Sequence, residues 1–303
     1  MEKILITGAQ GFIGRHLSKY LNSLGYKITG IGHGFWTERE WKSWGLSEWY
    51  EMDIALASLV AHGNNPYAIF HCAGSGSVGF SVDNPMQDFE RTVVSTINVL
   101  EYMRTLSRDS ILIYPSSAAV YGISEELPIT ENAKSNPTSP YGHHKKIAED
   151  LCLSYGRTYG LSIGIVRLFS VYGIELRKQL LWDSCLKSIN GSTEFFGTGA
   201  ETRDWINVKD VVRLMHKLIS VADTNVRIIN GGTGSAVKTS EVISYLFRRL
   251  NNKENLVFNG KTRKGDPQHY LADISAATSI GWHPEVSWRD GIDEYVDWFV
   301  SLK

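Results

Sequence analysis

The sequence predicts an α/β protein in which helices cover both faces of a parallel sheet. Short apolar runs alternate with longer stretches that carry apolar residues at helical spacing, and this alternation is typical of a doubly wound sheet. A glycine-rich turn joins the first apolar run to the first helical stretch. From Gly173 onward the alternation gives way to shorter, polar, glycine-rich pieces, which indicate a smaller C-terminal lobe.

The first element is a short apolar strand, 4–6, that leads into the turn TGAQGFIG. Gly8 permits a tight turn, Gly11 lets the backbone approach a pyrophosphate, and Gly14 allows the helix to pack closely on the strand. The helix that follows presents amide donors and the positive end of its dipole to a phosphate. A strand before this turn and a helix after it predict a Rossmann-type dinucleotide site.

The later elements continue the alternation. Strands are expected at 27–31, 68–72, 110–114 and 161–168, and helices at 85–106, 141–159 and 208–221. We expect a dinucleotide-binding domain over 1–172 to which 204–232 returns, and a substrate-binding lobe made of 173–203 and 233–303. The tryptophan-rich segment 35–50 is interpreted as a packed insertion beside the cofactor, with a partner surface as the alternative.

Three side chains form a candidate catalytic group. Ser117 follows the apolar strand that ends near Tyr114, and ligands of open α/β sheets bind at the carboxyl ends of strands. Tyr141 and Lys145 are four residues apart, so a helix places them on one face. A lysine there favours the phenolate and lowers the tyrosine pKa, so that the phenol can exchange a proton with an alcohol or a ketone.

Composition excludes several other classes of protein. The chain has 303 residues, 43% hydrophobic content and a formal charge of −1. Its composition therefore predicts no excess of positive charge that would bind nucleic acid or an anionic membrane. No apolar run approaches membrane-spanning length. Cys72, Cys152 and Cys185 lack the spacing of metal ligands, so we expect no metal and a cytoplasmic location.

These motifs resemble those of an extended short-chain dehydrogenase/reductase of the NAD-dependent epimerase/dehydratase family, which acts on nucleotide sugars. The resemblance covers nearly the whole chain. It is carried by TGAQGFIG at 7–14, HCAG at 71–74, SSAAVYG at 116–122, SPYGHHK at 139–145, VRLFSVYG at 166–173, TRDWINVKD at 202–210 and RKGDP at 263–267.

The resemblance implies a role for each matching position, and a place in polysaccharide biosynthesis. Ser117, Tyr141 and Lys145 correspond to the catalytic residues, and the lysine also holds the nicotinamide ribose. Asp204 and Asp210 are expected to serve structure. The expected cofactor contacts are Gly8, Gln10, Gly11, Phe12, Ile13, Gly14, His33, Asp53, Ile54, Ala73, Tyr141 and Lys145, and the expected substrate contacts are Ser75, Ser117, Phe196, Arg203 and Arg263.

Departures from the family pattern narrow the reaction. Ala118 and Ala119 stand where dehydratases carry an Asp-Glu pair, so dehydration is not expected. Gly32 stands where NAD-specific relatives have an acid that binds the adenosine ribose. Without that carboxylate a 2′-phosphate is not repelled, so NADP is slightly favoured over NAD. Thr92 and Ser170 replace asparagines that are common in relatives, which weakens the transfer of substrate contacts there.

The first interpretation is therefore an NAD(P)-dependent oxidoreductase that reduces a 4-keto nucleotide sugar. The alternative is a nucleotide-sugar 4-epimerase with tightly bound NAD, and the remote alternative is a non-catalytic dinucleotide-binding protein. A homodimer is expected, because relatives pair helices 85–106 and 141–159 with their copies. The apolar residues offered for a second helix face are Val94, Val99, Cys152 and Leu153.

Overall fold

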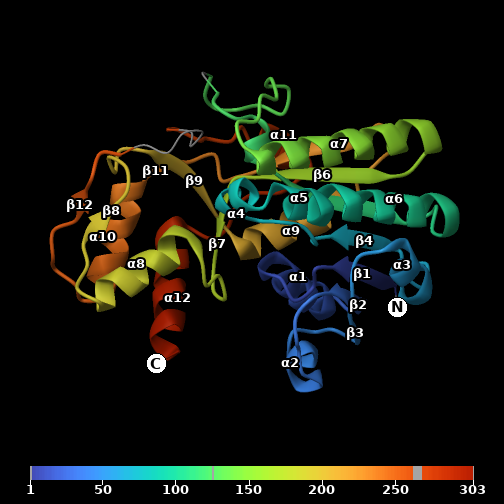
Figure 1. Ribbon diagram of the computed structural model, residues 1–303, viewed down its shortest axis with the longest axis horizontal. Helices are drawn as coiled ribbons and strands as arrows, with labels where there is room; N and C mark the ends of the chain where they lie inside the picture. The colour runs from blue at the N-terminus through green and yellow to red at the C-terminus, as the bar shows by residue number, and fades with distance from the viewer. Residues whose placement is uncertain (1, 125, 262–267, 303) are drawn as a thin grey trace. The chain divides into compact units, whose positions relative to one another are not determined.

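The computed structural model describes residues 2–124, 126–261 and 268–302, and the chain forms two compact units (Figure 1). The first unit contains the residues up to Gly122, together with Lys134–Leu168 and Val212–Ile229. The second contains Ile123–Ala133, Phe169–Val211 and the residues from Asn230 onward. The predicted division had the same discontinuous form, but it placed 123–133, 169–172, 204–211 and 230–232 with the dinucleotide-binding part. The binding roles of the two units stay predictions.

The first unit is built on a seven-stranded sheet in the order β10-β6-β5-β4-β1-β2-β3, and neighbouring strands from β6 to β3 pair in parallel. Its elements are β1 (Lys3–Thr7), α1 (Phe12–Ser23), β2 (Lys27–Gly32), α2 (Glu38–Ser43), β3 (Glu48–Glu51), α3 (Leu56–His62), β4 (Ala68–His71), α4 (Val78–Asp83), α5 (Pro85–Phe89), a π-helical turn (Glu90–Val94), α6 (Ser95–Leu106), β5 (Ile111–Ser117), a 3-10 turn (Ala118–Val120), α7 (Pro140–Tyr159) and β6 (Ile163–Leu168), and α9 (Val208–Leu218) and β10 (Arg227–Gly231) span its boundaries with the second unit.

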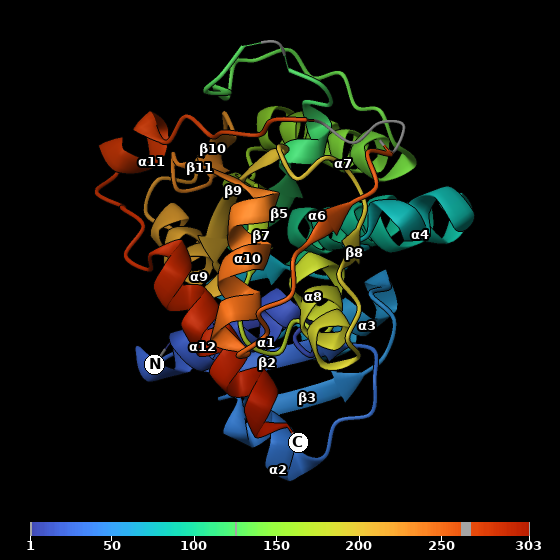
Figure 2. The same ribbon diagram turned by 90° about the vertical axis from the view of Figure 1, so that its left-hand side faces the viewer.

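Helices cover both faces of this sheet. On one face α3, α6 and α7 pack side by side (Figure 1). On the other, α1 contacts α9 through the rings of Tyr20 and His216, whose centroids lie 5.7 Å apart (Figure 2). The prediction of a doubly wound α/β fold is therefore confirmed.

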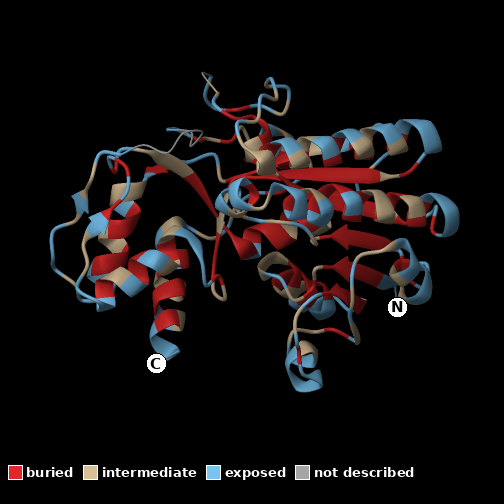
Figure 3. Ribbon diagram, in the orientation of Figure 1, coloured by how far each residue is buried: buried red, intermediate tan, exposed pale blue. Residues whose placement is uncertain are grey.

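The central strands are apolar because both of their faces are covered. Leu5, Ile69 and Leu112 lie next to one another across β1, β4 and β5, and all three are fully buried (Figure 3). The chain leaves β1 toward β2 on one side and returns to β4 on the other. The carboxyl ends of β1 and β4 therefore form the switch point at which such sheets bind ligands.

Two predicted segments differ from the structure in detail. The helix expected at 85–106 is divided into α5, a π-helical turn and α6. Turns of this kind are inserted into helices mostly at functional sites. The segment 35–50 contains α2 and the first residues of β3, a strand that the sequence analysis did not predict.

The tryptophans of 35–50 pack against α1. The Trp36 and Trp49 rings meet edge to face at 5.4 Å. The Arg15 guanidinium lies 5.7 Å from the centre of the Trp36 ring and 5.4 Å from that of Trp44. This agrees with the interpretation of 35–50 as a packed insertion.

The second unit contains a three-stranded sheet in the order β11-β9-β7 and a two-stranded sheet of β12 and β8. The buried Asp204 carboxylate accepts hydrogen bonds from the backbone amides of Thr233, Gly234 and Ala272. Asp210 accepts two more from the loop before α12, so both aspartates serve structure, as expected. The elements are β7 (Ser170–Tyr172), α8 (Gln179–Ile189), β8 (Glu194–Phe195), β9 (Thr202–Asn207), β11 (Ala236–Lys238), α10 (Thr239–Arg249), β12 (Val257–Phe258), α11 (Ser275–Ser279) and α12 (Trp288–Ser301).

No helix within the described ranges is both long enough and apolar enough to span a membrane.

A buried ion pair anchors α7 to β6. Glu149 on α7 is fully buried and accepts two hydrogen bonds, of 3.0 and 2.8 Å, from the Arg167 guanidinium. The same guanidinium donates to the Tyr121 hydroxyl at 3.1 Å and lies over its ring. Because a buried charge is very unfavourable without its partner, this pair fixes α7 in one position on the sheet.

We predict that Glu149→Ala lowers the free energy of unfolding by about 3–5 kcal/mol, because it leaves the Arg167 guanidinium buried without its counter-charge. Chemical denaturation measures this. The matched control is Asp150→Ala, which removes an exposed carboxylate that pairs with Lys146 on the same helix and is expected to cost about 0–1 kcal/mol. Equal effects of the two substitutions would contradict the anchoring role.

Candidate active site

The glycine turn after β1 depends on backbone contacts that exclude side chains. Gly8 has a positive φ of 69°, and a Cβ there would lie 2.6 Å from the Ala73 nitrogen. A Cβ on Gly14 would lie 2.3 Å from the Gly8 carbonyl oxygen. Neither neighbour can move away easily, because both contacts are with backbone atoms. The turn and the helix therefore touch only because both positions are glycine.

This turn has the features of a phosphate site. Gly11 is the N-cap of α1, and no described side chain caps the helix there. The amides of Phe12, Ile13 and Gly14 in the first turn have no partner within an α-helix, and they lie at the positive end of its dipole. Such a cradle fits the pyrophosphate of a dinucleotide.

Gln10 ties the glycine turn to the loop after β2. Its side-chain amide donates to the Phe35 carbonyl at 2.8 Å. Its own backbone carbonyl accepts from the Arg15 guanidinium at 3.0 and 2.7 Å. The tryptophan-packed Arg15 thus helps to hold the turn in shape.

His33 and Asp53, both predicted to contact the cofactor, lie after the ends of β2 and β3 and form an ion pair of 2.7 Å. Both side chains are largely exposed. The neighbouring Ile54 carbonyl accepts a hydrogen bond from Asn98 at 3.0 Å. On the other side of the turn, the Ala73 amide faces the Thr7 hydroxyl at 3.3 Å. The first unit therefore gathers the predicted cofactor contacts around the switch point of its sheet.

Gly32 is packed closely against the glycine turn and the Trp49 ring. A Cβ on Gly32 would lie 3.3 Å from Gly8 backbone atoms and 3.3 Å from the Trp49 ring. A larger side chain there would press on the glycine turn. The missing acid therefore accompanies close packing at this point and is not by itself evidence for a cofactor with a 2′-phosphate, which weakens the ground on which NADP was favoured.

The three predicted catalytic side chains also lie in the first unit. Ser117 is the last residue of β5, and its hydroxyl acts on the Tyr141 phenol by lowering its pKa. Tyr141 and Lys145 lie in the first two turns of α7, which begins after the N-cap Ser139. The Ser139 hydroxyl accepts from the Gly142 amide at 3.2 Å, so a local capping bond fixes where the helix starts.

The protonation of Tyr141 and Lys145 differs from what the sequence led us to expect. Burial raises the pKa of Tyr141, and the Ser117 hydroxyl opposes that rise. Lys145 is not among the groups that shift the pKa of Tyr141, so the expected decrease by its charge is not found. The Lys145 ammonium donates to the Pro115 carbonyl at 3.0 Å and lies 4.8 Å from the centre of the Tyr114 ring. Burial lowers the pKa of Lys145 to about 8.

His71 serves structure beneath this site. Its ring nitrogens contact the Thr7 hydroxyl at 2.7 Å and the Thr96 hydroxyl at 3.2 Å. Burial is the main cause that lowers the pKa of His71, to about 3, so the ring is neutral. It holds β1, β4 and α6 together and is not available as an acid.

The predicted substrate contacts are distributed over both units. The Ser75 amide faces the Thr92 hydroxyl at 3.4 Å in the first unit. In the second unit, Phe196 is 43% exposed, and the Arg203 guanidinium donates to the Thr202 and Gln268 carbonyls. Arg263 lies outside the described residues. The assignment of these residues to a substrate stays a prediction.

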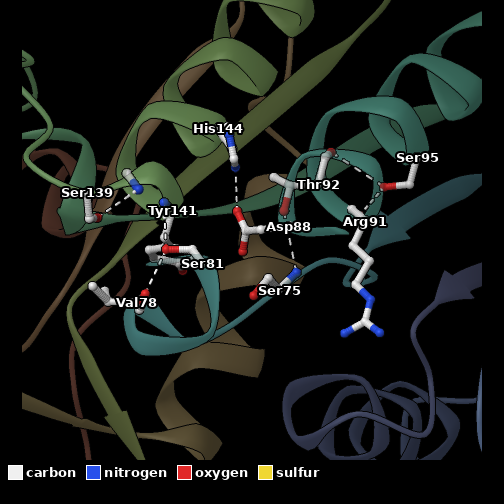
Figure 4. A network of polar contacts seen from close by, with 11 residues as sticks. Ser75, Val78, Ser81, Asp88, Arg91, Thr92, Ser95, Ser139, Tyr141 and His144 are labelled. Atoms are coloured by element: carbon white, nitrogen blue, oxygen red, sulfur yellow. Dashed lines mark hydrogen bonds and ion pairs between the residues drawn. The ribbon is translucent and has the colours of Figure 1, made fainter. Parts of the chain in front are cut away.

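One group of polar contacts was not predicted from the sequence (Figure 4). The His144 ring contacts the Asp88 carboxylate at 2.5 Å, and Ser81 accepts a hydrogen bond from the Tyr141 amide at 3.0 Å. Asp88 and His144 are 56 residues apart in the chain. The only sequence signal was the unusual pair His143-His144 beside Lys145, the predicted catalytic lysine.

The comparisons with known proteins agree with this geometry. A candidate UDP-glucose 4-epimerase of Methanocaldococcus jannaschii is 33% identical, and the alignment covers 98% of each chain. The solved UDP-glucose 4-epimerase of Thermotoga maritima, in complex with UDP-glucose, superposes with a TM-score of 0.89 at 26% identity, over 99% of each chain. The UDP-glucuronic acid 4-epimerase of Bacillus cereus, in complex with UDP-glucuronic acid and NAD, gives a TM-score of 0.88 at 26% identity, over 99% of this chain and all of the other.

The family assignment follows from sequence as well as structure. The sequence profile of the NAD dependent epimerase/dehydratase family matches residues 4–232. The glycine turn, the serine at the end of β5 and the tyrosine and lysine of α7 all lie in that range. The chain therefore belongs to the NAD-dependent epimerase/dehydratase family, and it is an extended short-chain dehydrogenase/reductase of the nucleotide-sugar epimerase type.

Proposed function

We propose that this protein is a nucleotide-sugar 4-epimerase that keeps NAD bound through the whole reaction. The observation that carries the proposal is that Ser117, Tyr141 and Lys145 lie in the same unit as the glycine turn, in a chain with several similar proteins that are named as 4-epimerases. The 4-keto reductase, our first interpretation, rested on NADP and on Gly32. The close packing of Gly32 weakens that support, and the relatives favour the epimerase.

NAD is the cofactor that fits the described residues. The uncapped start of α1 suits a pyrophosphate, and the exposed Asp53 carboxylate lies beside His33 at the end of β2. A carboxylate repels the extra phosphate of NADP. The Bacillus cereus enzyme, to which this chain is similar, was solved with NAD. The amides at the start of α1 would hold the pyrophosphate of NAD, and the bound cofactor would supply hydride transfer at carbon 4 of the sugar.

The side chains of this chain handle the proton. In the oxidation, Tyr141 accepts the proton of the 4-hydroxyl while Ser117 hydrogen-bonds to the same oxygen and orients it. Lys145, on the same face of α7 as Tyr141, is the cation expected to hold the nicotinamide ribose. In the reduction, Tyr141 returns the proton as the hydride reaches the opposite face of carbon 4. Ala118 and Ala119 cannot carry protons, so loss of water does not compete.

A homodimer is part of this proposal. Val94 in the π-helical turn and Ile147 on α7 are each 40% exposed, and these two elements pack against each other. A second copy would cover both by a two-fold symmetric contact. Of the residues expected to supply a second helix face, Val99 and Cys152 are fully buried in the core of the first unit, so they cannot serve.

The setting we propose is the supply of sugar donors for polysaccharide synthesis in the cytoplasm. Cys72, Cys152 and Cys185 are free thiols, as expected of a chain kept in a reducing compartment.

The first test combines cofactor content with reaction. We predict that the purified protein releases NAD(H), and no matching amount of NADP(H), when it is denatured. It should then interconvert the 4-epimers of UDP-glucose or UDP-glucuronate without added cofactor. Substrate carrying deuterium at carbon 4 should keep its label in the product, because the same hydride returns.

The opposite result would support the reductase instead. In that case the protein would be isolated without dinucleotide and would oxidise added NADPH in the presence of a 4-keto nucleotide sugar. Loss of the carbon-4 deuterium to added cofactor would likewise contradict an epimerase with retained NAD.

The second test concerns Tyr141. We predict that Tyr141→Phe lowers kcat by about 10²- to 10⁴-fold, because only the phenol oxygen that exchanges the proton is lost. NAD content and thermal stability should stay near those of the wild type. Tyr159→Phe, at the exposed end of the same helix, serves as the control and should keep full activity. Activity of Tyr141→Phe within about twofold of wild type would end this assignment.

The third test concerns the dimer. We predict that the protein sediments at twice its 33.9 kDa chain mass at micromolar concentration. Ile147→Glu should shift it to the monomer, because the new charge faces its own copy across a two-fold axis. Val300→Glu introduces the same charge at a position of α12 that is 51% exposed and should leave the dimer intact. A wild-type monomer would contradict the proposal.

A further inference from the structure

The start of α7 is attached to the α4–α5 segment at two places that the mechanism above does not use (Figure 4). The first is the buried hydroxyl of Ser81. It accepts a hydrogen bond from the Tyr141 amide at 3.0 Å and donates to the Val78 carbonyl at 2.7 Å. The first backbone amides of a helix have no hydrogen-bond partner within that helix. In α7, Ser81 of the neighbouring helix α4 accepts the hydrogen bond of one such amide, which belongs to Tyr141.

The second attachment is the contact between Asp88 on α5 and His144 on α7. One carboxylate oxygen lies 2.5 Å from His144 Nδ1. Asp88 is fully buried, and its other oxygen has no hydrogen-bond partner among the described residues. His144 is 13% exposed and has the Phe89 ring edge-on at 5.4 Å. A buried carboxylate is costly unless it is paired, so the contact with His144 stabilises Asp88 at this position.

The charge of Asp88 acts on the catalytic residues. It contributes to the raised pKa of Tyr141, after burial as the main cause. For Lys145, burial lowers the pKa to about 8, and the negative charge of Asp88 opposes that decrease. Asp88 therefore favours the ammonium form of Lys145.

Other groups also face Lys145, and they have to be counted beside Asp88. Among the acids, Glu149 is already paired with Arg167, whereas the only described partner of Asp88 is an imidazole. The groups around Lys145 are Cys72 after β4, Tyr114 and the Pro115 carbonyl on β5, His71 on β4, and Glu149 and Cys152 on α7.

We propose that Asp88 and His144 are positioning residues for the catalytic group: their ion pair fixes the start of α7 to α5 and places a buried negative charge beside Tyr141 and Lys145. The inference rests on the acid–base roles proposed above for those two residues. The inference adds the Asp88 carboxylate to the groups that act on the site, beyond Ser117, Tyr141 and Lys145.

Three variants separate shape from charge. Asp88→Asn keeps the size of the side chain and an oxygen that accepts from His144, but removes the charge. Asp88→Ala and His144→Ala remove the contact itself. His143→Ala is the matched control, because His143 is exposed and adjacent on the same helix. Thermal unfolding and NAD titration first establish that each variant is folded and binds the cofactor.

The steady-state rates test the positioning. For Asp88→Ala and His144→Ala we expect kcat to fall about 10- to 100-fold at unchanged KM, since small displacements of a catalytic group have effects of this size. The double variant should be no worse than either single one, because both remove the same contact. Additive losses, or a raised KM at unchanged kcat, would overturn the inference.

The pH dependence tests the charge. In Asp88→Asn the alkaline limb of kcat should move to lower pH, because Lys145 loses its proton more easily without the neighbouring carboxylate. The limb of His143→Ala should match the wild type. A purely structural role for Asp88 predicts an unmoved limb, and that result would overturn the proposal.

A measurement without substrate keeps this test independent of the proposed reaction. The ultraviolet absorbance of tyrosinate, taken as the difference between each protein and its Tyr141→Phe counterpart, reports the ionisation of Tyr141 alone. Asp88→Asn should lower its midpoint, because a neighbouring negative charge is lost. If no nucleotide sugar is epimerised but the midpoint moves, the proposed function fails and the role of the pair stands. If the enzyme is active but the midpoint is unmoved, the function stands and the role of the pair fails.

Discussion

Helix α7 carries two of the three side chains proposed as catalytic, and its inner face buries charged groups against the sheet. Its attachment therefore has to satisfy charge as well as pack apolar atoms. Lys145 and Glu149 lie one turn apart on this face. Glu149 is satisfied by Arg167 of β6, and Lys145 by the Pro115 carbonyl of β5. Each strand next to the helix thus supplies one polar partner, which fixes both the rotation of α7 and its position along the sheet.

On the predicted cofactor side of the site, the elements are held together by close contact between backbones. Gly8 contacts the backbone at the start of the loop that follows β4. Gly14 contacts Gly8, and Gly32 lies against the same glycine turn. Three strands and one helix converge there with no room for side chains. The identity of residue 32 therefore reflects this packing, and cofactor preference has to be judged from the groups around it, such as His33 and Asp53.

The sequence predicted the parts of the fold that local patterns encode. The apolar strands, the glycine turn and the start of α7, expected at Tyr141 and found at Pro140, could be inferred because each depends on neighbours in the chain. Strand β3 was missed, because Glu48, Trp49, Tyr50 and Glu51 form neither a continuous apolar run nor an alternating pattern. The π-helical turn was missed too, since its residues continue a helical pattern.

The polar partners of the catalytic residues could not be predicted for a related reason. The spacing of Tyr141 and Lys145 indicated that they share a helix face, but the partner of the ammonium is a backbone carbonyl of β5. The contact of Asp88 with His144 joins helices that are distant in the chain. Neither leaves a pattern in one sequence, because both depend on how the elements pack.

Burial is what gives these partners their importance. It raises the pKa of Tyr141 and lowers that of Lys145, so it opposes both charged forms that the reaction uses. Some neighbours act in the other direction: Ser117 favours the phenolate, and Asp88 and Glu149 favour the ammonium. Asp88 also adds to the raised pKa of Tyr141, so its charge acts on the two groups in different ways. The residues around the motif therefore decide whether the motif can work as an acid and a base near neutral pH.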